Sequence, residues 1–261
     1  VRFTVLTDRL LRLEYDPAGQ FEDRPSQAFW YREQPVPQFT SRVTDESVEI
    51  ETDFLHLKYR ITRRGFHRST LSIRLKQSGA TWRYGMKPRG NLGGTARTLD
   101  AVAGRTRLEP GLVSRQGWAV VDDSASLVFD DSGWLKPRIE GHEHPEKTKN
   151  FRGEKDLYFF GYGLAFADCL RDFTRVAGPV PMIPRYILGN WWSRYWAYTQ
   201  SELQDLMDDF RRHDVPLSVC IVDMDWHITQ TGNSSDGWTG YTWNRELFPD
   251  PPGFVRWLHE Q

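Results

Sequence analysis

An apolar run that ends in acidic and aromatic residues constrains the fold most. Residues 217–227 read LSVCIVDMDWH, and the stretch before Asp223 is too hydrophobic for a strand with one solvated face. It predicts a strand buried on both faces, as in a parallel sheet covered by helices. Asp223, Asp225, Trp226 and His227 follow at the carboxyl end of that strand. In barrels of alternating strands and helices, ligands bind and reactions take place at this end.

The residue types at this strand end favour a neutral, polyhydroxylated ligand. A carboxylate accepts hydrogen bonds from two hydroxyl groups, and an indole ring covers the apolar face of a sugar. The formal net charge of -1 provides no general attraction to nucleic acid or to an anionic membrane. Aromatic residues make up 14% of the chain, which suits either a stacking ligand or a large aromatic core. We therefore predict a carbohydrate site.

The neighbouring residues predict a βαβ unit. Residues 186–192, YILGNWW, have the pattern of a second buried strand. A helix then begins at a capping box formed by Thr199 and Glu202, and a final helix covers residues 253–260. The two strands of a βαβ unit run parallel and their crossover is right-handed, so both strands are expected to end at the same edge of the sheet. About two strand-helix repeats fit into residues 184–261, whereas a closed barrel needs eight.

The first half of the chain has a different, strand-like pattern. Up to about residue 134, apolar residues alternate with polar ones, as at Leu55 and Leu57, and turn residues separate the segments. An antiparallel β-sandwich is the expected fold. The glycine-rich stretch 91–100 is expected to be a loop that approaches something closely, where Gly93 and Gly94 form either a turn or a ligand cradle.

The period changes after residue 155. Residues 156–163 predict a strand that ends in glycines, and Phe166, Leu170 and Phe173 then recur at helical spacing. The proline-rich segment 178–184 is expected to end this helix and to link two domains. We predict one domain over residues 1–180 and a second over residues 181–261.

The cysteines and the one close pair of histidines have the spacing of neither a disulfide framework nor a metal site. Cys169 and Cys220 are expected to be buried free thiols. His142 and His144 lack a third ligand at a suitable spacing, so a solvated loop is expected there, with no metal and no cofactor. The first residues show no signal-peptide pattern and no apolar run spans a bilayer, which favours a soluble, cytoplasmic protein.

Several composite motifs resemble glycoside hydrolase family 31, the α-glucosidase and α-xylosidase group. Three of them resemble the opening of its catalytic barrel: PRYILGNWWSRYWAYTQSEL, PLSVCIVDMDWH and GWTGYTWNRELFPDPPGF. Three others resemble the preceding sheet domain: NLGGTARTLD, GLVSRQGWAVVDDS and DLYFFGYG. The resemblance implies a galactose-mutarotase-like β-sandwich followed by an incomplete (β/α)8 TIM barrel.

The resemblance also implies an activity. A family member is a retaining, exo-acting α-glycosidase that hydrolyses or transfers α-linked glucose by double displacement at two aspartates, without a cofactor. Both aspartates are expected beyond residue 261, so this chain alone should be inactive. The alternative is a non-catalytic carbohydrate-binding protein. The implied partner is an oligosaccharide or α-glucoside. Self-association through the open barrel edge is also expected, because an unpaired strand edge promotes pairing.

The resemblance places Asp223 against sugar hydroxyls, Met224 in the pocket wall, Tyr195 at the pocket edge and Asp100 on a loop of the sandwich. Asp225 and Trp226 flank the site by position only. Residues two apart on a strand lie about 6.6 Å apart, so spacing alone leaves open a nucleophilic role for Asp223 or Asp225, which the resemblance assigns to later residues.

Structural roles compete with these assignments. Asp223 could instead cap the next turn or pair with Arg194. Tyr195 and Trp226 could pack the barrel rim. The pair Asp122 and Asp123 has the pattern of a simple turn.

Overall fold

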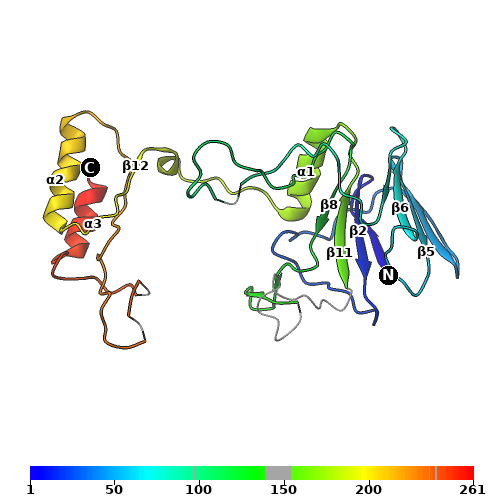
Figure 1. The fold of residues 1–261 in the computed structure, drawn as a ribbon, viewed down its shortest axis with the longest axis horizontal. Helices are drawn as coiled ribbons and strands as arrows, with labels where there is room; N and C mark the ends of the chain where they lie inside the picture. The colour runs from blue at the N-terminus through cyan, green and yellow to red at the C-terminus, as the bar shows by residue number, and fades with distance from the viewer. Residues whose placement is uncertain (97, 139–153, 235, 239) are drawn as a thin grey trace. The chain divides into compact units, whose positions relative to one another are not determined.

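Two units make up the structure, a computed structural model that describes residues 1–96, 98–138, 154–234, 236–238 and 240–261. The first unit is Val1–Val180 and the second is Pro181–Gln261 (Figure 1). No helix within the described ranges is long and apolar enough to cross a membrane. The predicted loop around His142 and His144 lies outside the described residues.

The first unit contains two antiparallel sheets. The five-stranded sheet joins consecutive strands in the order β3 (Thr40–Val43), β4 (Ser47–Glu51), β5 (Leu55–Arg60), β6 (Leu71–Leu75) and β7 (Thr81–Arg83). The four-stranded sheet has the order β1 (Arg2–Val5), β2 (Leu10–Tyr15), β11 (Lys155–Phe160) and β8 (Ala119–Asp122). A short hairpin of β9 (Val128–Phe129) and β10 (Leu135–Lys136) completes the strands described.

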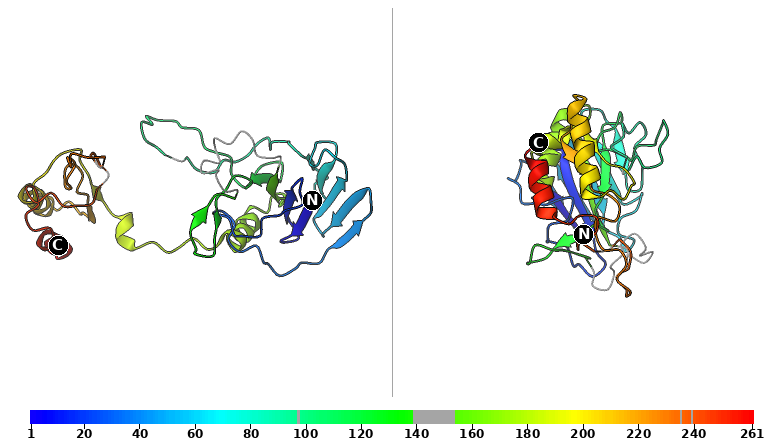
Figure 2. Two further views of the ribbon diagram at one scale, coloured as in Figure 1. Left: turned by 90° about the horizontal axis from the view of Figure 1, so that it is seen from below. Right: turned by 90° about the vertical axis from the view of Figure 1, so that its left-hand side faces the viewer.

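One hydrophobic core joins the two sheets. Leu57 and Ile73 of the five-stranded sheet pack in the same buried cluster as Leu13 and Phe159 of the four-stranded sheet. Figures 1 and 2 show the sheets as adjacent layers. The alternating pattern predicted at Leu55 and Leu57 is confirmed, because every second side chain of β5 is buried in this core.

Strand β2 differs from the half-solvated strand that its alternation predicts. Its residues are buried on both faces, including the charged Arg12 and Glu14. The reason is its central position: β2 pairs with β1 and β11, and helix α1 (Phe166–Ala177) covers the face that does not contact the other sheet. Figure 1 shows α1 beside β8 and β11.

Helix α1 confirms the predicted helix but presents a different face. The spacing predicts Leu170 on the apolar face, yet this residue is 52% exposed. The buried face instead carries Cys169, Phe173 and Val176, which pack on Tyr158 and Phe160 of β11. The predicted set (Phe166, Leu170 and Phe173) and the observed set (Cys169, Phe173 and Val176) are both apolar and both have the spacing i, i+4, i+7. Contact with the sheet therefore decides which set is buried. The helix ends before Gly178, whose φ of 101° suits glycine.

The second unit has shorter strands than predicted. Its elements are η2 (Arg185–Leu188), β12 (Trp191–Trp192), α2 (Gln200–Arg212), β13 (Val219–Cys220) and α3 (Pro251–His259). Strand β12 pairs in parallel with β13, Trp191 opposite Val219 and Trp192 opposite Cys220. The strand predicted over 186–192 is therefore a 3-10 turn followed by a two-residue strand.

The prediction that residues 217–222 are buried on both faces is wrong for this unit. Val219 and Cys220 are only partly buried. Full burial of a parallel strand requires a neighbouring strand on each side and helices over both faces. Within the described part of the chain, β13 pairs with β12 alone.

The helices of the second unit agree with their local signals. The Thr199 side chain accepts the Glu202 backbone N–H and the Glu202 side chain accepts that of Thr199, which confirms the capping box. The final helix starts two residues earlier than predicted, because Pro251 occupies its first turn and Asp250 caps it. Leu203 of α2 and Phe254 of α3 share a core, and Figures 1 and 2 show these helices side by side.

Candidate functional site

The ends of β12 and β13 bring Asp223 next to Ser193. Both strands run in the same direction, so the residues that follow them lie at one edge of the sheet. The Ile221 backbone N–H donates to the Trp192 carbonyl at 2.9 Å, which continues the pairing beyond the two strands. The Ser193 hydroxyl then donates a long hydrogen bond of 3.5 Å to Oδ2 of Asp223.

Asp223 keeps free capacity to accept hydrogen bonds. Among the described residues, Ser193 is its only hydrogen-bond partner, and no ion pair joins Asp223 to Arg194. The Arg194 guanidinium instead lies 4.6 Å from the ring centre of Trp196 and donates to the Tyr198 hydroxyl at 3.4 Å. The alternative of an ion pair between Asp223 and Arg194 is therefore wrong. A half-buried carboxylate with one long hydrogen bond can accept hydroxyl groups of a ligand.

Two exposed aromatic rings lie together in this unit. Tyr195, in the loop after β12, stacks on Trp238 with ring centres 6.2 Å apart and planes 28° from parallel. Tyr195 is 74% exposed and Trp238 is 55% exposed. The sequence places Trp238 only in a loop that can fold over this end of the strands, and the aromatic run GWTGYTWN is the signal for it.

Trp226 has a different environment from Tyr195. Its ring packs edge-on against Trp243 at 5.0 Å and against His227 at 5.0 Å. His227 is buried, and the backbone around it pairs with residues 242–244 through an isolated bridge to Trp243. These contacts make Trp226 part of the packed wall of the loop.

A turn follows Asp223. Met224 and Asp225 form it, and Asp225 has a φ of 54°, in the left-handed region that aspartate tolerates better than most residues. The 6.6 Å spacing argument assumes an extended strand, so it does not apply to Asp223 and Asp225 in this conformation. Both residues are half-buried, as is Met224.

Asp100 lies in the first unit, in an exposed loop. The Thr98 side chain accepts the Asp100 backbone N–H at 3.1 Å. At the base of this loop, Oδ1 of Asn91 accepts the backbone N–H groups of Gly93 at 2.9 Å and Gly111 at 2.8 Å. The glycine-rich stretch is predicted to approach another group closely, and that group is the backbone of residues 109–111 in the same loop. A Cβ atom on Gly111 would lie 2.3 Å from the Gly93 carbonyl oxygen.

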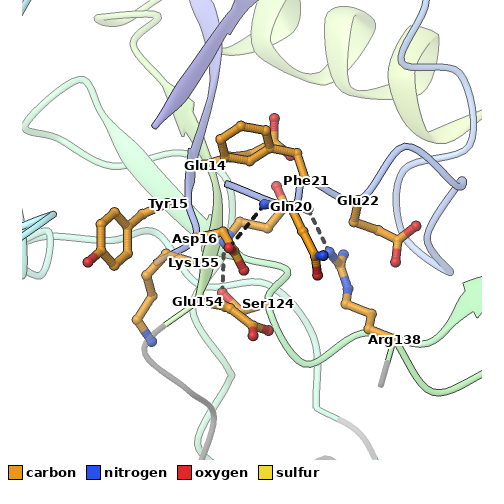
Figure 3. Close-up of a pocket in the computed structure, with 11 residues that line it drawn as sticks. Glu14, Tyr15, Asp16, Gln20, Phe21, Glu22, Ser124, Arg138, Glu154 and Lys155 are labelled. Carbon is orange, nitrogen blue, oxygen red and sulfur yellow. Dashed lines mark hydrogen bonds and ion pairs between the residues drawn. The ribbon is translucent and has the colours of Figure 1, made fainter. Parts of the chain in front are cut away.

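A cavity of about 310 Å³ in the first unit contains many charged residues. Figure 3 shows the residues that line it, from β2, the following segment, Ser124, Arg138 and the start of β11. Arg12 forms two hydrogen bonds of 2.8 Å to the Asp156 carboxylate, which also accepts one from Arg138 at 2.9 Å. Nothing in the sequence spacing predicts this pair, because Arg12 and Asp156 are 144 residues apart.

Arginine side chains pair with the two buried acids of this cluster. Burial by itself raises the pKa of Asp156, but the hydrogen bonds and positive charges of Arg12 and Arg138 outweigh burial and lower it. The sequence predicts a simple turn at Asp123, yet this residue is 1% exposed and pairs with Arg138 at 2.7 Å. Burial raises the pKa of Asp123 although the charge of Arg138 opposes it. The acids Asp123 and Asp156 already have arginine partners, which suits a structural network better than a catalytic pair.

The cysteines and one group of potential metal ligands are the other reactive side chains of the described residues. Cys169 and Cys220 are free thiols, as predicted. Cys169 is buried, but the prediction that Cys220 is buried is wrong, because β13 is only partly covered. One group of three potential metal ligands occurs in the described part of the chain: Glu49, Glu51 and His56, on β4 and β5. It belongs to the first unit, whereas β12 and β13 belong to the second.

An apolar groove of about 810 Å³ lies along the second unit. Its lining includes Met207 of α2, Cys220 of β13, and Phe254 and Leu258 of α3. Pairing with β12 occupies one edge of β13. The groove contains none of the predicted sugar contacts, so it is distinct from the end of β13 that Asp223 follows.

Comparison with known proteins assigns residues 180–261 to a family. They match the family model described as "Glycosyl hydrolases family 31 TIM-barrel domain". An α-xylosidase of Saccharolobus solfataricus is 24% identical over 151 residues, which cover 58% of this chain and 19% of that protein. Alpha-glucosidase 2 of Bacillus thermoamyloliquefaciens is 30% identical over 98 residues, 38% of this chain and 11% of that protein.

A solved structure extends the similarity to the whole fold. The family 31 α-xylosidase from a soil metagenome, complexed with xylose, superposes with a TM-score of 0.63 and 14% identity. The match covers 99% of this chain and 43% of that structure. The chain thus has the fold of a sheet domain with part of a barrel, and it spans about a fifth or less of the two relatives named above.

Proposed function

We propose that the chain is part of a retaining, exo-acting α-glycosidase, because residues 180–261 match the TIM-barrel domain of glycoside hydrolase family 31. In this proposal the first unit is a galactose-mutarotase-like β-sandwich and the second is the start of a (β/α)8 barrel. The ligand is an oligosaccharide or a simple α-glycoside. The proposed sugar is glucose, with xylose as its competitor, since the relatives include an α-xylosidase and an α-glucosidase.

The position of Asp223 carries the proposal. Asp223 follows β13, lies next to Ser193 and keeps acceptor positions for hydroxyl groups. In parallel β/α folds, ligands bind at the carboxyl ends of the strands. An anionic acceptor at that place suits a neutral sugar, because its charge-assisted hydrogen bonds orient the ring without any positive charge on the ligand.

The other proposed contacts complete a sugar subsite. Met224 contributes an apolar wall, and the exposed ring of Tyr195, stacked on Trp238, offers an edge against which a sugar can pack. Trp226 and Asp225 support the turn that holds Asp223 in place. We propose Asp100 as a further acid from the sandwich loop.

Double displacement needs two carboxyl groups about 5 to 5.5 Å apart. We place both the nucleophile and the acid/base beyond residue 261 of the natural protein, as the family resemblance implies. Asp225 lies within the tight turn that follows Asp223, and a sugar-binding role suits Asp223 best. The chain alone is then inactive. Two carboxylates suffice for this mechanism, so the proposal includes no cofactor.

The test compares Asp223→Asn in the full-length natural protein with the exposed control Asp205→Asn on α2. Turnover of 4-nitrophenyl α-glucoside and α-xyloside is measured side by side. The loss of a charged hydrogen bond of about 2 to 3 kcal/mol lowers kcat/KM roughly 30- to 150-fold. The control retains the activity of the unmodified protein. Equal turnover in Asp223→Asn and the control removes Asp223 from the site, and the better substrate identifies the sugar.

The exposed Tyr195–Trp238 pair favours one second candidate, a non-catalytic carbohydrate-binding protein. Stacking on aromatic rings binds sugars without any catalytic carboxylate. Calorimetry of the chain with maltose, for the unmodified protein and for Tyr195→Ala, tests this candidate. Binding that depends on Tyr195, together with no hydrolysis by the full-length protein, would replace the enzyme by a binding protein.

We also propose that the chain alone self-associates. The free edge of β13 and the apolar groove beside it expose surface that a complete barrel would cover. Sedimentation velocity of the isolated chain is expected to show dimers or larger species that grow with concentration. A single monomeric species with a cooperative melting transition contradicts this expectation.

A further inference from the structure

We propose that Glu49, Glu51 and His56 form a binding site for one Zn²⁺ ion on the outer face of the five-stranded sheet. The three residues lie on the neighbouring strands β4 and β5. They belong to the first unit, whereas Asp223 of the proposed sugar site belongs to the second.

The strand register brings the three side chains together. Glu51 is directly opposite His56, and Glu49 is opposite Lys58. Side chains two residues apart on a strand project from the same face, and diagonal neighbours across two strands are within reach of long side chains. The opposite face carries Ile50 and Leu57 in the core, so the three polar groups share the solvent side.

The distances fit a tetrahedral ion. Nε2 of His56 lies 3.1 Å from Oε2 of Glu49 and 3.5 Å from Oε1 of Glu51. Zinc bonds of about 2.0 to 2.1 Å place the ligand atoms of a tetrahedron about 3.3 to 3.4 Å apart. Two of the three separations already match this spacing. The third, between the two carboxylates, is at most 4.8 Å, and a rotation of one exposed glutamate shortens it.

The ligand chemistry selects zinc over the common hard cations. An imidazole nitrogen with two carboxylate oxygens suits Zn²⁺, whereas Mg²⁺ and Ca²⁺ prefer oxygen ligands alone. Two carboxylates balance the charge of a divalent ion. Water would take the fourth position.

An ion-pair network is the competing explanation of the same contacts. Lys58 lies 3.4 Å from Glu49, and Lys76 lies 2.9 Å from Glu51. Both lysines are exposed, and such surface pairs add little stability. The Lys76 ammonium also donates to the Thr52 carbonyl at 2.6 Å, so it keeps that hydrogen bond when a divalent ion replaces it at Glu51. Arg74 is opposite His56 on β6 and adds an exposed positive charge to the same face of the sheet. A bound ion would connect β4 to β5 and stabilise the sheet.

Calorimetric titration of the metal-free chain with ZnCl2 tests the proposal, with His56→Ala and Glu51→Gln as site variants. The matched control is His67→Ala, because His67 is an exposed histidine of the same unit that bonds Ser69 instead of the cluster. The double variant His142→Ala/His144→Ala removes any zinc bound by those two histidines, so the zinc that remains bound can be assigned to other residues. Melting temperatures with and without ZnCl2, and with MgCl2, provide a second readout.

We expect one Zn²⁺ ion per chain at this site, with affinity at least about tenfold lower in both site variants, since even second-shell partners of metals contribute that much. The His67 control and the double variant keep the site. Zn²⁺, but not Mg²⁺, raises the melting temperature of the unmodified chain. Binding that is absent, or unchanged in His56→Ala, overturns the proposal and leaves the ion-pair network. If His56→Ala does not fold, Co²⁺ is bound in place of Zn²⁺ to the unmodified chain and to His56→Gln, and the visible spectra are compared. Loss of the tetrahedral Co²⁺ bands in His56→Gln supports the site. Persistence of these bands overturns it.

Discussion

The buried Arg12–Asp156 pair provides the sharpest test of how the first unit is stabilised. The side chains are 5% and 6% exposed, and two hydrogen bonds of 2.8 Å join them. Asp156→Asn preserves the volume of the side chain but removes its charge. Arg12 and Arg138 then lose the acid that they share, and each keeps one other partner: Glu14 lies 3.0 Å from Arg12 and Asp123 lies 2.7 Å from Arg138. Breaking a buried ion pair in this way costs about 3 to 5 kcal/mol.

The expected loss is measured by chemical denaturation together with hydrogen exchange of peptides from β2 and β11, which report on the first unit alone. The matched control is Asp168→Asn on α1 of the same unit, whose exposed ion pair with Arg171 is worth at most about 1 kcal/mol. A loss below about 1 kcal/mol in Asp156→Asn would refute the reasoning, because it would mean that the remaining partners, Glu14 and Asp123, compensate both arginines by themselves.

The same pair predicts a dependence on pH. The pKa of Asp156 is lower in the folded than in the unfolded chain, where carboxyl groups of aspartate titrate near 3.9. Its stabilisation is therefore complete above that unfolded value and is lost as the pH falls through the folded value. The difference in unfolding free energy between the unmodified chain and Asp156→Asn should shrink below about pH 4. A difference that stays constant down to pH 2 would contradict the lowered pKa.

Three further changes have expected outcomes. Thr199→Ala removes the cap of α2 and should cost about 1 kcal/mol, seen as faster hydrogen exchange in the first turn of the helix; unchanged exchange would count against the capping box. Gly111→Ala places a Cβ atom against the Gly93 carbonyl and should cost about 1 to 3 kcal/mol in thermal denaturation, whereas Gly240→Ala, with ordinary contacts, should not. Burial raises the pKa of the Cys169 thiol to about 12, so a thiol reagent at pH 8 should modify it only after unfolding; rapid modification of the native chain would show that the thiol is accessible.

Local signals are sufficient for several elements. The capping residues of α2, the prolines that open α3 and the alternation in β5 each act within one or two turns or a single strand, so their effect can be read from neighbouring residues. The motifs around Asp223 also indicate the family without reference to the fold, and the match of residues 180–261 confirms that resemblance.

Other features depend on residues that are distant in sequence. The burial of Cys169 instead of Leu170 on α1 depends on which helix face meets β11, and both faces have helical spacing. The lengths of β12 and β13 depend on the neighbours that each strand has for pairing. An apolar sequence indicates that a strand can be buried, but the surrounding elements decide whether it is.

The helix caps, the alternation in β5 and the resemblance to a family can be read from the chain alone, because they follow from patterns over a few residues. Which charges meet depends instead on the folded arrangement. Arg12 finds Asp156 across 144 residues, and His56 meets Glu49 and Glu51 through the pairing of β4 with β5. Strand pairing and register set such contacts, and a composition or spacing along one strand contains no information about the residues on the next.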